Sequence, residues 1–292
     1  MLSFKIGDVR ITRVEEQYGP TLPLNALLPS ADLAEMEHLG DRREQFYEPA
    51  SGCVYASMHS WLVQTPQHTI LVDTCNGNHK ERAMEGFGGL DLPWLDTLAA
   101  AGVKPEDVDL IVCTHLHLDH VGWNTTLQGT EWVPTFPNAK ALIHRNDLEF
   151  WNPTNPESVA IGINANVFED SVQPLLDRDK VTVWEGDGHT IDDTLQLALA
   201  AGHSPGMAIG LLESKGERGI FAADSMHSPL QVFRPDWFCG FDLIPADAEA
   251  TRRRILERCA ETDAMLMPAH FAAPHAYKVR AQGDGFIALN GV

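Results

Sequence analysis

The segment from Thr114 to Gly122 constrains this chain more than any other, because it places three imidazoles and one carboxylate within six positions. It reads Thr-His-Leu-His-Leu-Asp-His-Val-Gly, and an apolar stretch leads into it. A solvated loop would carry Ser, Gly or Lys between its histidines, whereas this one carries Leu116 and Leu118. Imidazole and carboxylate donors suit Zn²⁺ and its first-row neighbours, and no cysteine is among them to favour a soft thiolate site. The segment therefore predicts a metal site.

The residues before this segment predict how its side chains are presented. The run from Val108 to Thr114 is apolar and β-branched, which is typical of a buried strand. His115 and His117 are two residues apart and leave that strand on the same side, so they could bind one metal ion. Asp119 and His120 follow where the chain turns toward a helix, and they could bind a second ion. One segment thus predicts half of a two-metal site.

The remaining ligands should also follow strands, because open α/β folds place their binding sites at strand ends. Three candidates do so: His203 after the apolar run 195–201, Asp224 after the run 219–223, and His270 after the run 264–267. Each alone has an ordinary alternative as a capping, turn or hydrogen-bonding residue. Their shared position after strands, in order behind the first motif, favours a common role as metal ligands.

Together these motifs resemble the metallo-β-lactamase-fold hydrolase superfamily, from about Ser60 to about Phe271. The resemblance implies an α/β fold, a four-layer αββα sandwich, around a dinuclear metal site. Asp73, at the end of the predicted strand 68–73, would support the metal-binding histidines from behind, although it could also be a turn residue. The implied ligands are His115, His117 and His203 on one metal, Asp119, His120 and His270 on the other, and Asp224 bridging the two.

The ligand set separates this chain from several relatives. Asp224 stands where the best-known zinc lactamases have a cysteine, and His117 stands where flavodiiron proteins have a glutamate. Acidic residues outnumber Lys and Arg by 41 to 21, giving a formal charge of −20 that would repel nucleic acid. The resemblance is then closest to quorum-quenching lactonases and glyoxalase II-like enzymes, within a group that also includes thioesterases and phosphotriesterases.

The chain also departs from those enzymes next to its ligands. Lactonases and glyoxalase II proteins tend to read Gly-His-Thr-Pro-Gly-His at the third ligand, whereas this chain has Ser204 and Met207 at the Thr and second His positions. Trp123 follows the first motif where they usually have glycine. We expect Trp123 and Phe271 to line an apolar substrate pocket, although aromatic residues are also common in cores. The departures leave the metal ligands intact and leave the substrate open.

The ligands themselves suggest a mechanism. Two divalent cations that share a water lower its pKa from about 15.7 toward 7, so a hydroxide is present at neutral pH and can attack a polarised carbonyl. Asp119 could accept the proton and pass it toward the leaving group. His227, three residues after Asp224, stands where lactonases resembling this chain have a tyrosine. It could donate to the substrate oxygen or act as a general acid, or it could be a loop histidine bonded to backbone.

Length and composition predict one catalytic domain over residues 1–292, with insertions near 17–50 and 150–177. The candidate ligands span 115–270, so no division between them leaves a working half. No apolar run approaches the length of a membrane span, no signal peptide is evident, and the five cysteines are scattered and odd in number. We therefore expect a soluble, cytoplasmic protein that acts on a small molecule, with no nucleic-acid or membrane partner and with homodimerisation left open.

The sequence thus predicts a metal-dependent hydrolase that opens a lactone or a related ester of a small apolar molecule. The alternatives are hydrolysis of a phosphotriester, a thioester or another xenobiotic bond by the same fold, and a non-catalytic metal-binding or scaffold protein. The cofactors would be two divalent ions, first of all Zn²⁺, with Mn, Fe and Co as alternatives.

Overall fold

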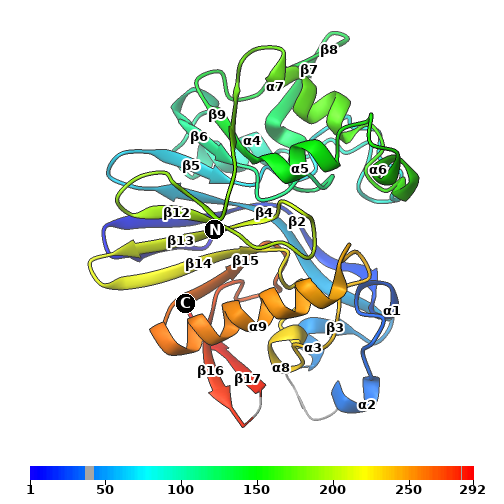
Figure 1. The fold of residues 1–292 in the computed structure, drawn as a ribbon, viewed down its shortest axis with the longest axis vertical. Coiled ribbons are helices and arrows are strands. Elements are labelled where there is room, and N and C mark those ends of the chain that lie inside the picture. The colour runs from blue at the N-terminus through cyan, green and yellow to red at the C-terminus, as the bar shows by residue number, and fades with distance from the viewer. Residues whose placement is uncertain (37–42, 284) are drawn as a thin grey trace. The chain divides into compact units, whose positions relative to one another are not determined.

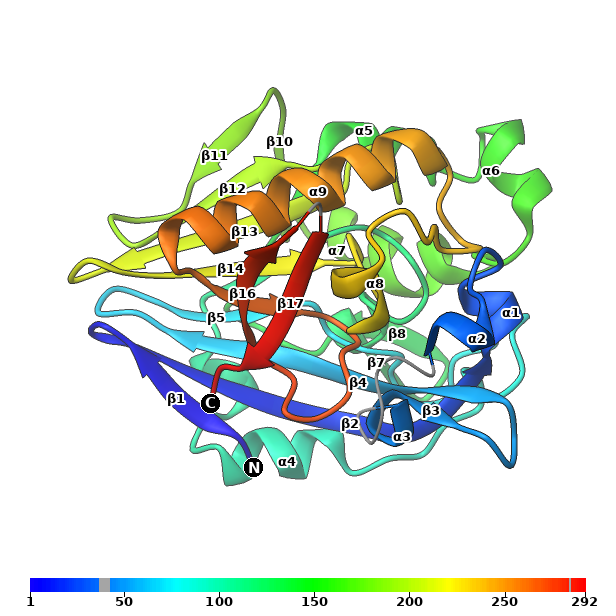
Figure 2. The same cartoon turned by 90° about the horizontal axis from the view of Figure 1, so that it is seen from below.

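A computed structural model describes residues 1–36, 43–283 and 285–292. The chain forms two compact units, each built on a β-sheet with helices (Figures 1 and 2). Unit 1 comprises Met1–Glu16 and Met58–Thr194, and unit 2 comprises Gln17–Ser57 and Leu195–Val292. Among the described residues, none of the helices has the length and apolar character needed to cross a membrane.

The sheet of unit 1 positions the first motif. Its strands β5, β6, β9 and β10 are parallel neighbours, and the residues of β5, β6 and β9 form almost continuous buried apolar runs. Such runs are typical of parallel strands that are covered on both faces. Because parallel strands end at the same edge, the residues after β5 and after β6 are brought together. The strand order is β1 (Ser3–Ile6), β2 (Val9–Pro23), β4 (Cys53–Gln64), β5 (Thr69–Val72), β6 (Leu110–Val112), β9 (Lys140–His144) and β10 (Val181–Trp184).

The helices of unit 1 bury apolar residues at helical spacing, as Trp94 and Leu98 of α4 do. The end of the predicted insertion 150–177 is helical, with a π-helical turn, η4, followed by α7. Pro174 does not break α7, because it lies at the start of that helix. The other elements are α4 (Trp94–Ala100), η2 (Pro105–Asp107), η3 (Gly122–Asn124), β7 (Thr125–Gln128), β8 (Glu131–Pro134), α5 (Arg145–Phe150), α6 (Pro156–Ile161), η4 (Phe168–Val172), α7 (Gln173–Leu176) and β11 (Gly188–Thr190).

The sheet of unit 2 presents the later candidate ligands. Its strands run in the order β12 (Leu195–Leu199), β13 (Ala208–Ser214), β14 (Glu217–Ala223), β15 (Met265–Pro268), β16 (Tyr277–Gln282) and β17 (Gly285–Asn290). All neighbours are antiparallel except β14 and β15, whose parallel pairing requires a long crossover. That crossover contains α9 (Pro245–Thr262), which lies along the sheet of this unit (Figure 2). Its Ile255, Leu256 and Cys259 are part of the apolar core of unit 2.

The predicted insertion near 17–50 is ordered over its described part, and residues 37–42 lie outside the described residues. It forms α1 (Leu24–Leu27), α2 (Leu33–Met36), α3 (Arg43–Phe46) and β3 (Tyr47–Glu48), which pairs with β4. Its apolar side chains, such as Leu28 and Met36, pack with Trp237, Cys239 and the helix α8 (Leu230–Phe233). The insertion thereby supports the loop that follows α8.

Candidate metal centre

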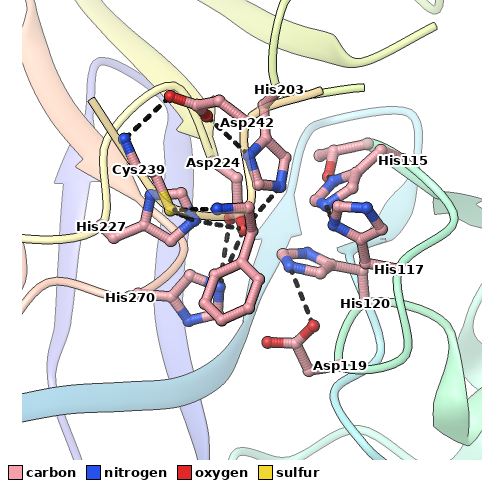
Figure 3. A network of polar contacts seen from close by, with 12 residues as sticks. His115, His117, Asp119, His120, His203, Asp224, His227, Cys239, Asp242 and His270 are labelled. Carbon is pink, nitrogen blue, oxygen red and sulfur yellow. Dashed lines mark hydrogen bonds and ion pairs between the residues drawn. The ribbon is translucent and has the colours of Figure 1, made fainter. Parts of the chain in front are cut away.

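The three histidines of the first motif converge in unit 1. His115 Nε2 lies 3.0 Å from His117 Nδ1, and the ring centroids of His115 and His120 are 4.0 Å apart. Both His115 and His120 are buried. Asp119 lies at the rim, with its Oδ1 3.6 Å from His120 Nε2 (Figure 3). The structure therefore brings together all four motif residues that the sequence selected.

Asp73 lies behind this group, where β5 ends. Its Oδ1 accepts a hydrogen bond from the Thr114 backbone N–H at 2.9 Å, and its Oδ2 accepts one from the Thr114 hydroxyl at 2.9 Å. The same Oδ2 lies 2.9 Å from His120 Nδ1. Such a contact fixes the ring of a metal-binding histidine and leaves Nε2 facing the ion. The geometry is that of the supporting role expected for Asp73.

The loop after β5 and the motif loop are joined through their backbones. Thr74 N donates to His120 O at 2.7 Å, and Gly122 N donates to Cys75 O at 2.7 Å. Gly122 approaches the facing loop so closely that a Cβ there would lie 1.8 Å from Asn76 O. Only glycine fits this position, which explains the glycine that closes the motif.

A half-buried carboxylate that sequence reasoning missed, Glu16, holds the same loop. It accepts hydrogen bonds from the backbone N–H groups of Asn76 and Gly77 and from Trp123 Nε1, the last at 2.7 Å. Burial raises the Glu16 pKa, and these donors lower it only in part. Trp123 is buried and stacks on Trp94, with ring centroids 5.4 Å apart. Its observed contacts are those of a core residue, and its role at a substrate pocket stays a prediction.

In unit 2, three imidazoles surround the carboxylate of Asp224, which follows β14. Asp224 Oδ2 lies 3.0 Å from His227 Nε2 and 3.5 Å from His203 Nε2. Asp224 Oδ1 lies 3.1 Å from His270 Nε2. All four side chains are buried, and Figure 3 shows the three imidazoles around the Asp224 carboxylate. The structure thus brings the three later candidates together and adds His227 to them.

His203 is positioned by a second buried carboxylate, Asp242, which the sequence did not reveal. Asp242 Oδ1 lies 2.9 Å from His203 Nδ1, and Asp242 Oδ2 accepts a hydrogen bond from Cys239 N at 2.9 Å. Burial raises the Asp242 pKa, but the hydrogen bond from His203 and the positive charges of His203, His227 and Arg252 lower it more. Asp242 lies in a loop, and no periodic apolar pattern flanks it in the sequence. It is identified by its short distance to His203 in the folded structure.

Arg252, the first of three consecutive arginines in α9, is a buried charge behind this loop. Arg252 is fully buried and donates to Ser225 O at 2.8 Å and to Pro235 O at 2.7 Å. Its Nη2 lies 3.4 Å from Asp242 Oδ2. The guanidinium therefore ties α9 to the loop that carries Asp242.

The ring of His227 points at Asp224 and not at backbone (Figure 3). Its Nε2 also lies 3.7 Å from Cys239 Sγ, while its Nδ1 has no hydrogen-bond partner among the described residues. Burial lowers the His227 pKa, but Cys239 and Asp224 raise it more, to well above its usual value. The alternative of a loop histidine bonded through its ring to backbone does not describe this side chain.

Phe271 is buried in the apolar core of unit 2, and its ring contacts the edge of Tyr277 at 5.5 Å between centroids. Neighbouring His270 lies with its Nδ1 3.2 Å from Ser57 O. Phe271 is thus placed as a core residue that holds the strand end carrying His270, and its role in lining a pocket stays a prediction.

The donor sets of both units fit divalent zinc-type ions. Each is made of imidazoles and carboxylates, the harder ligands that zinc shares with Mn, Fe and Co. Buried imidazoles whose Nε2 atoms face a carboxylate, and whose Nδ1 atoms are held by another acceptor, are arranged as metal ligands usually are. This holds for His120, His203 and His270. The residues present therefore suit the ions that the sequence predicted.

The sequence profile of the metallo-beta-lactamase superfamily matches residues 58–270. The chain belongs to this superfamily. The match covers nearly all of the segment on which the resemblance was based, and all the candidate metal ligands lie within it. The chain is therefore a metal-dependent hydrolase of the metallo-beta-lactamase superfamily, as the sequence predicted.

Among curated members of the superfamily, the chain is similar to N-acyl homoserine lactonases. It is 30% identical over 225 residues to the lactonase AttM of Rhizobium radiobacter, a match that covers 72% of this chain and 80% of the relative. It is 28% identical over 195 residues to an N-acyl homoserine lactonase of Bacillus cereus, covering 62% of this chain and 69% of the relative.

Solved structures of superfamily members confirm the fold. AidC, a dizinc quorum-quenching lactonase crystallised with a product, aligns with a TM-score of 0.80 at 24% identity, over 100% of this chain and 97% of its own. The hydrolase AbOPH aligns with a TM-score of 0.81 at 24% identity, over 99% of this chain and 96% of its own. The mixed α/β metallo-beta-lactamase fold expected from the sequence is thus confirmed.

Proposed function

We propose that this chain hydrolyses the ester bond of a lactone, using two zinc ions held by the seven ligands predicted from its sequence. The observation that carries the proposal is the donor set, in which every position that the superfamily pattern requires is filled by an imidazole or a carboxylate. The seven are His115, His117, Asp119, His120, His203, Asp224 and His270.

When bound, two such ions supply an activated water at neutral pH and polarise the substrate carbonyl. The chain's own residues orient and move protons around that chemistry. Asp73 and Asp242 hold the Nδ1 atoms of His120 and His203, so that each Nε2 faces the site. Asp119, less buried than the histidines, is suited to carry a proton toward the leaving oxygen.

Two observations support a lactone as the substrate. Two curated relatives that match this chain, from Rhizobium radiobacter and Bacillus cereus, are named N-acyl homoserine lactonases. The formal charge of −20 disfavours polyanionic substrates and is compatible with an uncharged ring ester. A small, uncharged lactone with an apolar substituent therefore satisfies both.

We also propose a cytoplasmic location, which the cysteines support. All five are free, and four of them are buried. Free thiols are usual where the surroundings are reducing, which supports the cytoplasm as the place of action. Homodimerisation stays a prediction from the sequence.

Metal content and substrate preference together test the proposal. Purified protein should carry about two zinc ions per chain, and turnover should be measured on an acyl homoserine lactone, an aryl ester, a thioester and a phosphotriester. The expected result is two ions with the highest kcat/KM on the lactone. If the protein carries two ions but turns over another substrate faster, the proposed substrate is wrong and the proposed metal chemistry stands. No metal uptake and no turnover would favour a protein that keeps the fold for binding.

A further inference from the structure

The two peptide groups that flank Leu116 join His115 to His117, and they set the directions of both side chains. The N–H of Leu116 belongs to the peptide plane shared with His115, and its carbonyl belongs to the plane shared with His117. Because the flanking dihedrals rotate each plane, holding both planes restricts ψ of His115 and φ of His117, and so restricts the directions in which the two side chains leave the backbone. Leu116 itself is buried, so neither peptide group can rely on bulk water for its hydrogen bonds.

The first plane is held from α5. Asp147 Oδ2 accepts a hydrogen bond from Leu116 N at 2.8 Å, and the Asp147 side chain is buried. A carboxylate that accepts from a buried backbone N–H makes a short, charge-assisted bond. This contact links the motif to the strand β9 and helix α5, which are part of the same unit.

The second plane is held from the segment 150–177, which the sequence identified as an insertion. Asn164 Nδ2 donates to Leu116 O at 2.6 Å. Only the amide nitrogen can face a carbonyl oxygen, so the chemistry fixes the orientation of this side chain. The other amide atom, Oδ1, is buried and has no hydrogen-bond partner among the described residues. The hydrogen bond of this amide group is therefore the one that Nδ2 donates to the motif.

A second contact joins the same segment to the motif. The ring of Trp151 meets the ring of His117 edge-on, with centroids 4.9 Å apart and an interplanar angle of 71°. Asn164 and Trp151 therefore reach the two ends of one short stretch, the carbonyl of Leu116 and the imidazole of His117. Both contacts lie within unit 1.

We propose that Asn164 is a positioning residue for His115 and His117, and that through it the segment 150–177 sets how tightly the chain holds metal. The proposal rests on the proposed function, because it assumes that these histidines are ligands. Outer contacts of this kind typically change metal affinity 10- to 100-fold when they are removed. A substrate that moves the segment would then also act on the metal ligands.

The segment is anchored elsewhere, so removing Asn164 should not release it. Arg82 donates to both oxygens of Asp170, at 2.6 and 2.9 Å, and Lys80 Nζ donates to Asp170 O at 2.9 Å. Val167 and Phe168 are buried in the same stretch. The contact of Asn164 with Leu116 can therefore be tested separately from the folding of the segment.

The test compares zinc affinity, measured by competition with a chromogenic chelator, in the wild type and in N164D. This substitution keeps the shape of the side chain but replaces the donor with an oxygen that repels the Leu116 carbonyl. We expect a roughly tenfold or greater loss of affinity and a changed visible spectrum of the Co²⁺-loaded protein, which reports ligand geometry. N138D is the matched control for N164D, and N138A for N164A, because Asn138 Nδ2 also donates to a backbone carbonyl, that of Glu106, away from the motif.

Unchanged zinc affinity and an unchanged Co²⁺ spectrum in N164D would overturn the inference while leaving the proposed function intact. A wild-type protein that binds no zinc would overturn both. If N164D does not fold, N164A serves in its place, since it removes the donor without repulsion, and a several-fold loss of affinity is then expected. Equal loss in the matched Asn138 variant would show a general effect of stability and would also overturn the inference.

Discussion

The three imidazoles around Asp224 differ in what lies behind them. Asp242 holds the Nδ1 of His203, and a backbone carbonyl lies 3.2 Å from the Nδ1 of His270. The Nδ1 of His227 has no hydrogen-bond partner among the described residues. Metal-bound histidines almost always donate their second ring nitrogen to such an acceptor. The contrast separates His203 and His270, as candidate ligands, from His227, which is better suited to act on the substrate.

Replacing His227 should therefore reduce turnover without loss of metal. In H227A we expect kcat to fall by roughly 10²-fold or more, because a positioned proton donor is lost, while zinc content stays near that of the wild type. Steady-state kinetics on the preferred substrate and metal analysis of the same sample measure the two effects. H189A, a partly exposed histidine of unit 1, is the control. Loss of zinc in H227A would instead make His227 a ligand.

Helix α9 covers the sheet of unit 2 and also places the buried guanidinium of Arg252 against the loop behind His203. Arg252 donates to backbone carbonyls and pairs with Asp242, whereas Arg253 is partly exposed and pairs with Glu249 of its own helix. A buried charge that loses its partner is costly, and a surface pair contributes little. The adjacent residues Arg252 and Arg253 should therefore contribute very differently to the free energy of unfolding.

We expect R252A to lower the free energy of unfolding by about 3–5 kcal/mol and R253A by about 0.5 kcal/mol or less. Urea unfolding of the two variants, followed by circular dichroism at neutral pH, provides the comparison. R252K should not restore stability, because an ammonium cannot reproduce the forked contacts of a guanidinium. Equal stability of R252A and R253A would show that Arg252 is not the link between α9 and the loop.

A second buried cation joins the loop after β5 to the π-helical turn η4. Lys80 is fully buried, and its Nζ donates to Thr125 Oγ1 at 2.6 Å and lies 3.5 Å from the centroid of the Trp132 ring. Burial lowers the Lys80 pKa to about 7, with Asp170 opposing and Arg82 adding to that effect. The folded state therefore binds this proton less tightly than the unfolded chain does.

Stability should consequently rise as the pH is raised from about 7 toward 10. Over that window the unfolded chain holds a proton on Lys80 that the folded protein has lost, so the free energy of unfolding increases by up to about 1 kcal/mol per pH unit. Chemical unfolding at several pH values should show this slope in the wild type and a reduced slope in K80M. The control K140M, which replaces a surface lysine, should keep the wild-type slope. If K80M shows the same slope as the wild type, Lys80 is not the source of the pH dependence.

The ends of strands were predictable from sequence, and the loops between them were not. The apolar runs before His115, His203 and His270 mark buried strands, and candidate ligands follow each of them. Asp242 has no such flanking pattern, so its role emerges only from the fold. The burial of Arg252 does have a signal in the sequence, because Arg252 stands three or four residues from Ile255, Leu256 and Ala248, which belong to the buried stripe of α9.

Taken as a whole, the molecule divides its candidate ligands between two units of the chain. His115, His117, Asp119 and His120 belong to unit 1, while His203, Asp224 and His270 belong to unit 2. The sequence pattern could assign all seven, because the spacing within each motif is local. It could not reveal the division, since β2 and β4 pass from one unit to the other in mid-strand.

Removing the metal should lower the stability of the whole protein. An ion that binds only the folded state adds about 4 kcal/mol when its concentration exceeds Kd a thousandfold, which corresponds to roughly ten degrees in Tm. Calorimetry of chelator-treated protein, before and after zinc is restored, measures the shift. D224A should melt at the same temperature with and without zinc. A wild-type Tm that does not respond to zinc would contradict the assigned role of the ions.

The parallel pairing of β14 with β15 has a consequence for how the protein is made. Asp224 and His270 end these neighbouring strands but are separated by 46 residues, most of them in the crossover that contains α9. Chains emerge from the ribosome N-terminus first and fold as units. The histidines of unit 1 are therefore all synthesised while Asp224 and His270 are still missing, and the full donor set exists only after residue 270 has been translated.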